Sequence, residues 1–223
     1  MIYNMIYETA YLSLLVQIAV GIIDYLAIQI KIPKNKELFK DLLKVELGVQ
    51  IVEMIFYVWL VFNITNISNI TPKRYYDWIL TTPTMLITLM AFLDKNHYIG
   101  LAEYMNKNKY DIIKVLSANM MMLLFGLMGE LGYLQYQLAI IIGFIPFIYY
   151  YYEIYKKYVK DKETPTYKRG LFWFFFVIWS LYGVSAFFPY ILKNSFYNIL
   201  DLFAKNATGL FLAYNVWKFR INK

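Results

Sequence analysis

The chain has 223 residues, of which 60% are apolar and 20% aromatic, and its mean hydropathy is +0.45. Soluble domains of this size are less apolar, so the composition indicates an integral membrane protein. The net charge of +7 does not indicate a nucleic-acid partner, because the basic residues are dispersed over alternate loops. No cysteine is present and the single histidine, His97, falls in a loop, so we expect neither disulfides nor a metal centre.

Seven apolar windows follow one another along the chain, each long enough to cross a bilayer as a helix. They cover residues 7–30, 38–62, 74–93, 110–128, 133–155, 169–190 and 195–217. The first window follows a short stretch without the basic segment and cleavage site of a signal peptide, so we expect it to be retained. The sequence therefore predicts an all-α membrane protein, a bundle of seven transmembrane helices that forms a single domain over residues 1–223.

Lysine and arginine are concentrated in the first, third and fifth connections and after the last window. The other three connections contain only Lys73 and Lys193. By the positive-inside rule, this distribution predicts an N-terminus outside the cell and a C-terminus in the cytoplasm. The second connection, "NITNISNIT", contains three N-x-S/T triplets. Glycosylation and a plain polar loop both remain open as interpretations of these triplets.

Two acidic residues interrupt the second window. Glu46 and Glu53 are seven residues apart, so they share one helix face and lie about 10 Å apart along the axis. A row of carboxylates inside a bilayer favours cations. Alternatively, Glu46 extends to the membrane edge or pairs with Lys40 or Lys44, and Glu53 is a protonated carboxyl bonded to another helix.

The third and seventh windows carry opposite charges at helical spacing. "RYYDWILTTP" places Arg74 and Asp77 three residues apart, and "DLFAK" places Asp201 and Lys205 four apart. Charged side chains inside a membrane indicate a functional site. The lysine either joins helices through an ion pair or is an amine kept reactive toward a carbonyl by its apolar surroundings. Two carboxylates for one lysine favour the second interpretation.

These two motifs, together with "WSLY" in the sixth window, resemble the microbial rhodopsins, a seven-helix family that binds retinal as a protonated Schiff base. The motifs occur in the family's order, and the resemblance covers the entire chain. It implies all-trans retinal on Lys205, with Asp77 as primary counterion, Asp201 as second counterion and Arg74 on the outer side. The short loops resemble the small viral members of that family.

The resemblance also implies a retinal pocket. Its residues are Trp78, Thr81, Thr82 and Met85 in the third window, Met122 and Gly126 in the fourth, Gly143 and Phe147 in the fifth, and Trp179, Tyr182 and Ala186 in the sixth. Aromatic residues in a helical bundle are more often plain core, and only the lysine and carboxylates distinguish these. Gly183 replaces the family's usual proline and Ala186 a bulky aromatic, so we expect a looser pocket. We also expect threonine hydroxyls to bond the carbonyl that Pro83 leaves free.

Pumps of this family usually carry a carboxylic acid eleven residues after the primary counterion, and here that residue is Thr88. Lys193 stands where an acid of the outer proton-release pair would be. Helices one, two and seven are neighbours in this fold, so their polar residues would line a path beside the retinal. These residues are Ser13, Gln17, Asp24, Glu46, Glu53, Asn198 and Asn206.

The resemblance and the acidic second helix together favour a light-gated cation channel. A light-driven outward proton pump is the alternative, and a sensory photoreceptor that signals through a partner is the third. A transporter without retinal would make the lysine and aspartate arrangement accidental. We expect no enzymatic activity, and as partners we expect the lipid membrane, retinal, transported cations or protons and further copies of the chain, with no nucleic acid.

Overall fold

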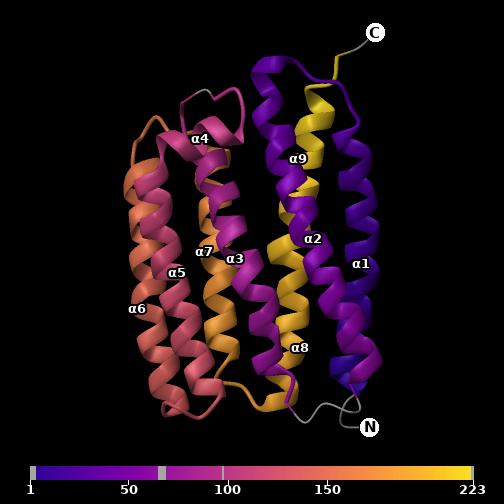
Figure 1. Cartoon of the computed structure of the whole chain (residues 1–223), viewed down its shortest axis with the longest axis vertical. Coiled ribbons are helices and arrows are strands. Elements are labelled where there is room, and N and C mark those ends of the chain that lie inside the picture. The colour runs from indigo at the N-terminus through magenta and orange to yellow at the C-terminus, as the bar shows by residue number, and fades with distance from the viewer. Residues whose placement is uncertain (1–3, 65–68, 97, 222–223) are drawn as a thin grey trace.

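The computed structural model describes residues 4–64, 69–96 and 98–221. Its long elements are helices that lie side by side in one bundle, and no strand occurs within these ranges (Figure 1). We call the end of the bundle where the chain begins the N-terminal end, and the opposite end, where it finishes, the C-terminal end. His97 and part of the "NITNISNIT" connection lie outside the described residues.

Seven long helical segments form the described bundle, as predicted. They are α1 (Asn4–Ile28), α2 (Glu37–Asn63), α3 (Thr71–Leu93), α5 (Lys109–Glu130), α6 (Tyr136–Ile154) with the π-helical turn η2 (Tyr155–Val159), α7 (Thr166–Ser185), and a composite of α8 (Tyr190–Asp201), the π-helical turn η3 (Leu202–Asn206) and α9 (Ala207–Lys218). Among the described residues, five helices are each long and apolar enough to cross a membrane, namely α1, α2, α3, α5 and α6. Their outward faces carry apolar side chains, as lipid contact requires.

The helices form a ring in chain order, and α3 is the most buried of the long spans. The composite helix packs against both α1 and α2, so helices one, two and seven are neighbours, as expected. It contains the π-helical turn η3, a widened turn of a kind that is frequent at functional sites. Lys205 lies in that turn, which packs against α1, α2 and α7, and its amine reaches Asp77 on α3.

The sixth predicted window was too long at its end. Helix α7 ends at Ser185, four residues before Pro189, and Pro189 is the residue that precedes α8. Proline has no backbone N–H to continue a helix but fits well at a helix start, so the chain turns here.

Pro83 lies inside α3 and cannot bond the Ile79 carbonyl one turn earlier. The hydroxyls of Thr81, Thr82 and Thr84 donate to the backbone carbonyls four residues before each of them. No side-chain hydroxyl of the described residues donates to the Ile79 carbonyl itself. The prediction that a threonine hydroxyl bonds this freed carbonyl was therefore wrong, because the three threonines bond the carbonyls of Asp77, Trp78 and Leu80 instead.

A short helix that the sequence analysis did not predict, α4 (Leu101–Lys107), covers the C-terminal end between α3 and α5. Its Glu103 carboxylate accepts hydrogen bonds from Lys107 at 2.6 Å and from the Ile99 N–H at 2.9 Å. These bonds, Lys107 first, hold the pKa of Glu103 below its ordinary value. The Leu101 N–H donates to Asp41 on α2 at 3.2 Å, which attaches this helix to the bundle.

Candidate functional site

The amino group of Lys205 faces three buried carboxylates. Its Nζ lies 2.5 Å from Asp77 Oδ2, 3.5 Å from Glu53 Oε1 and 3.7 Å from Asp201 Oδ1. The contact with Asp77 is a hydrogen bond. Sequence reasoning placed the two aspartates beside this lysine but assigned Glu53 to a separate path. The site therefore joins the predicted charge cluster to the acidic row on α2.

Arg74 lies one turn from Asp77 toward the N-terminal end and is fully buried. Its Nη1 is 3.6 Å from Asp201 Oδ2. Its Nε donates to the Asn194 side chain at 3.1 Å, and Nη2 donates to the Asn194 carbonyl at 3.1 Å and to the Asn198 side chain. The guanidinium thus ties α3 to α8 through several directed hydrogen bonds, an arrangement suited to its planar shape.

Two tyrosines hold Asp201 from opposite sides. The Tyr57 hydroxyl donates to Asp201 Oδ2 at 2.6 Å, and the Tyr182 hydroxyl donates to Asp201 Oδ1 at 2.6 Å. Both oxygens of this carboxylate are therefore hydrogen-bonded, whereas Oδ1 of Asp77 has no partner among the described residues. Tyr57 was missed by the sequence analysis, although it lies one helical turn after Glu53 and so shares its face.

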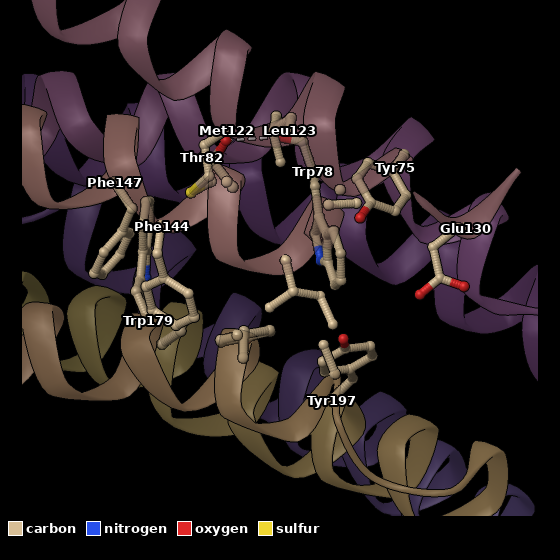
Figure 2. A pocket seen from close by; sticks show the side chains of 18 of the residues that line it. Tyr75, Trp78, Thr82, Met122, Leu123, Glu130, Phe144, Phe147, Trp179 and Tyr197 are labelled. Carbon is tan, nitrogen blue, oxygen red and sulfur yellow. Dashed lines mark hydrogen bonds between the residues drawn. The ribbon is translucent and has the colours of Figure 1, made fainter. Parts of the chain in front are cut away.

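A cavity of about 140 Å³ begins at Lys205 and extends between α3, α5, α6, α7 and the composite helix. Its lining is mostly aromatic and apolar. Figure 2 shows Phe144, Phe147 and Trp179 together at one end of it, Tyr75, Tyr197 and Glu130 at the other, and Trp78 between the two groups. The cavity therefore has an apolar end and a polar end.

Ten of the eleven residues predicted for the pocket line this cavity. They are Trp78, Thr82, Met85, Met122, Gly126, Gly143, Phe147, Trp179, Tyr182 and Ala186. The eleventh, Thr81, is buried but does not line it, and its hydroxyl donates to the backbone carbonyl of Asp77 at 3.0 Å. Sequence reasoning missed Tyr75, Glu130, Tyr136, Phe144 and Tyr197, because no pattern within one helix shows which side chains of other helices reach the same space.

Two glycines leave room that larger side chains of other helices occupy. A Cβ on Gly183 would lie 2.3 Å from Cζ of Phe144, and a Cβ on Gly126 would lie 2.4 Å from the Tyr75 hydroxyl oxygen. The looser pocket expected at Gly183 is therefore not observed there. The Phe144 ring fills the volume that a larger residue at position 183 would need.

Apart from Glu53, which lies beside Lys205, the predicted path residues fall into two groups. In the half toward the N-terminal end, Ser13 donates to the Asn198 carbonyl at 3.3 Å, and Gln17 donates to Ser13 at 3.5 Å. The Asn198 amide donates to the Ile6 carbonyl at 3.1 Å and to Thr9 at 2.9 Å, besides accepting from Arg74. This group is a hydrogen-bond network that joins α1 to α8, and within it only the Gln17 side-chain oxygen has no partner among the described residues.

In the half toward the C-terminal end, the side chains of Asp24, Glu46, Gln50 and Asn206 are buried and have no hydrogen-bond partner among the described residues. Gly209 makes room for Asp24, because a Cβ there would lie 2.2 Å from Asp24 Oδ2. Gln50 was missed, although it lies one turn after Glu46.

The alternative in which Glu46 extends to the membrane edge does not describe the structure. The Glu46 side chain is 0% exposed, and Lys44 pairs with Asp41 at 3.1 Å instead.

A seven-helix membrane bundle with a buried lysine, Lys205, that is surrounded by carboxylates and opens into an aromatic cavity defines the class of protein. The family model described as bacteriorhodopsin-like protein matches residues 8–219. The chain belongs to the bacteriorhodopsin-like family, whose members bind retinal as their chromophore.

Solved structures agree with this assignment, and no curated protein sequence matches significantly. The viral rhodopsin OLPVRII is 26% identical, with a TM-score of 0.79, over 97% of this chain and 99% of that one. A blue light-absorbing proteorhodopsin from Med12 is 21% identical, with a TM-score of 0.76, over 96% and 97%. Xanthorhodopsin, described as a light-driven ion pump with dual chromophore, is 17% identical, with a TM-score of 0.76, over 97% and 93%.

The chemistry of the cavity lining matches the chromophore of the family. An elongated apolar aldehyde needs an amine at one end and apolar walls along its length, and this cavity offers Lys205 and the aromatic lining. Gly183 and Gly126 both line the cavity. The Phe144 ring and the Tyr75 hydroxyl occupy the space that side chains at these two positions would need. Lys205 would hold retinal, and the ten lining residues named above would surround it.

Proposed function

We propose that the protein is a light-gated cation channel that forms a single domain over residues 1–223, with the N-terminus outside and retinal held on Lys205. One observation carries the proposal. From Glu53, beside Lys205, a row of buried polar side chains without hydrogen-bond partners continues toward the C-terminal end. Buried polar groups are nearly always satisfied, so such a row indicates space for water or ions.

When bound, retinal would supply light absorption and an isomerisation that displaces the positive charge at the Lys205 nitrogen. The response to that displacement depends on the chain's own residues. Asp77, Glu53 and Asp201 present three carboxylates to two cations, Lys205 and Arg74. Buried charge must be compensated, so the cluster is neutral when one carboxyl holds a proton.

We assign that proton to Glu53. Asp77 lies 1.0 Å closer to Nζ than Glu53 does, at 2.5 Å against 3.5 Å. Asp201 accepts two tyrosine hydrogen bonds and faces Arg74, which stabilises its anion. Displacement of the positive charge from Lys205 would then change the electric field at Glu53, the α2 carboxyl that faces this nitrogen. Glu53 would reorient or release its proton and so open the space toward Glu46.

Ion selectivity follows from the groups beyond Glu53. Asp24 and Glu46 are the carboxyl groups of this row beyond Glu53, and Asp24 is among the charged neighbours of Glu46. Carboxylates and amide oxygens lining a path favour cations over anions. The expected permeant ions are therefore protons and small cations.

The test is a current–voltage curve under light in voltage-clamped cells. A channel gives a photocurrent that reverses sign at a potential set by the cation gradient, and a current that stays outward at all accessible potentials would refute the proposal. Glu53→Gln should reduce the conductance or alter its time course. Glu103→Gln, on the surface helix α4, is the matched control and should leave the current unchanged. An unaltered current in Glu53→Gln would remove the second helix from the path.

A light-driven outward proton pump is the second candidate, and the direct hydrogen bond from Lys205 to Asp77 favours it. Such a bond provides an immediate proton acceptor. Thr88 stands at the position of the usual proton donor and has no acidic proton to give, but Glu46 lies beside it. Under this alternative, Glu46→Gln should slow recovery of the dark state, and the photocurrent should not reverse.

A further inference from the structure

A buried ion pair closes the polar end of the cavity. Lys193 Nζ on α8 lies 2.9 Å from Glu130 Oε1 and 3.2 Å from Glu130 Oε2, and 3.2 Å from the Tyr136 hydroxyl. The Tyr136 hydroxyl is also 3.0 Å from Glu130 Oε1 and 2.8 Å from the Ala186 carbonyl. The end of α5, the start of α6, the end of α7 and the start of α8 therefore meet at one point. We call Glu130, Lys193 and Tyr136 the closing cluster.

Outside the Lys205 site, the Lys193–Glu130 ion pair differs from the Lys114–Glu153 ion pair, which also joins two helices, in how deeply it is buried. The side chains of Lys193 and Glu130 are 8% and 7% exposed, whereas those of Lys114 and Glu153, near the opposite end, are 43% and 21% exposed. Removing one partner of a buried pair leaves an uncompensated charge and is strongly destabilising, whereas removing an exposed one changes little. The paired arrangement of Lys193 and Glu130 is therefore strongly favoured over one in which the two charges are separated.

Behind the closing cluster lies the polar end of the same cavity that reaches Lys205. Figure 2 shows the hydroxyls of Tyr75 and Tyr197 and the carboxylate of Glu130 directed into this space. Neither of these two hydroxyls makes a hydrogen bond to another residue in the described part of the chain, although both side chains are largely enclosed. Hydroxyl and carboxylate groups that converge on one space are suited to hold water.

This space is separate from the Arg74 network. Lys193 and Asn194 are adjacent on α8, but Lys193 points to Glu130 while Asn194 bonds Arg74 and Thr71. The ring of Tyr197 lies between the two systems, with the Arg74 guanidinium 5.5 Å from its centroid. The polar end of the cavity and the Arg74 network therefore lie on opposite sides of the Tyr197 ring.

We propose that this polar end is a water-binding access branch through which small polar molecules reach the Lys205 cavity from the N-terminal end of the bundle, and that the closing cluster keeps it shut. Opening requires the Glu130 carboxylate and the Lys193 amine to part. Their separation removes the ion pair that joins α5 to α8. The proposal rests on the proposed attachment of retinal to Lys205 and is independent of whether ions are conducted or pumped.

Hydroxylamine tests the branch, because it is a small polar nucleophile that destroys the retinal linkage only after reaching Lys205. The pigment is reconstituted with retinal in vesicles, with the N-terminal end of the bundle facing the reagent, and dark bleaching is followed by absorbance. Lys193→Met and Glu130→Gln should each bleach at least about tenfold faster than the unchanged protein. Lys114→Met, which breaks the exposed pair at the other end, is the matched control and should bleach at the unchanged rate.

Two further variants guard against misfolding. The double variant Glu130→Lys with Lys193→Glu restores a pair of reversed sign and should return the rate to within about threefold of the unchanged protein. Tyr136→Phe keeps the pair, loses its hydroxyl bonds, and should give an intermediate rate. Unchanged rates in both single variants, or equal acceleration in Lys114→Met, would overturn the proposal. Failure to form any pigment would instead refute the attachment at Lys205, so the two failures are distinguishable.

Discussion

The charge balance around Lys205 makes a quantitative prediction. If all three carboxylates were ionised, each would act on the Lys205 nitrogen in proportion to its inverse distance. With an effective dielectric constant of about 20, Asp77 at 2.5 Å contributes about 7 kcal/mol and Glu53 at 3.5 Å about 5 kcal/mol. Neutralising an ionised Glu53 would then have about two-thirds of the effect of neutralising Asp77. If Glu53 already holds a proton, replacing it by glutamine removes no charge.

The assay is the visible absorption band of the reconstituted pigment. Excitation moves positive charge away from the Lys205 nitrogen, so losing a nearby anion lowers the excitation energy and moves the band to longer wavelength. Asp77→Asn should therefore give a clear displacement, and Glu53→Gln only a small fraction of it. A displacement in Glu53→Gln that approaches two-thirds of that in Asp77→Asn would refute the assigned proton.

Two further predictions concern the stability of the pigment, measured by thermal loss of its visible band. Gly209→Ala places a Cβ 2.2 Å from Asp24 Oδ2 and should destabilise the protein by about 1–3 kcal/mol. Gly21→Ala, whose Cβ would meet no atom within 4 Å beyond its own stretch of helix, should not destabilise it. Equal stability of the two variants would contradict the close contact. Tyr57→Phe removes a 2.6 Å hydrogen bond to buried Asp201 and should destabilise by about 1–3 kcal/mol; a melting temperature identical to that of the unchanged protein would show that this bond is not formed.

Charged pairs within one helix were predictable from the sequence. Arg74 with Asp77, and Asp201 with Lys205, lie three and four residues apart, and helical geometry alone puts the members of each pair on one face. The order of the motifs along the chain then indicated the family to which the sequence belongs. What spacing could not give was the distance from Glu53 to Lys205, because that depends on how α2 packs against the π-helical turn η3.

The missed residues share the same cause. Phe144 fills space beside Gly183, and Glu130 meets Lys193, across pairs of different helices. No periodicity within a single helix encodes such contacts, and they follow only from the crossing and rotation of the helices. Tyr57 is the exception, because it lies one turn after Glu53, and its position on the acidic face of α2 was readable from the sequence.

The central claim is that the Lys205 amine carries the chromophore between its carboxylates. Adding all-trans retinal to purified apoprotein tests it most directly. The protein should develop a visible absorption band that acid displaces and hydroxylamine bleaches, and Lys205→Ala should develop none. A visible band of equal strength in Lys205→Ala, or no band in the unchanged protein, would contradict the account.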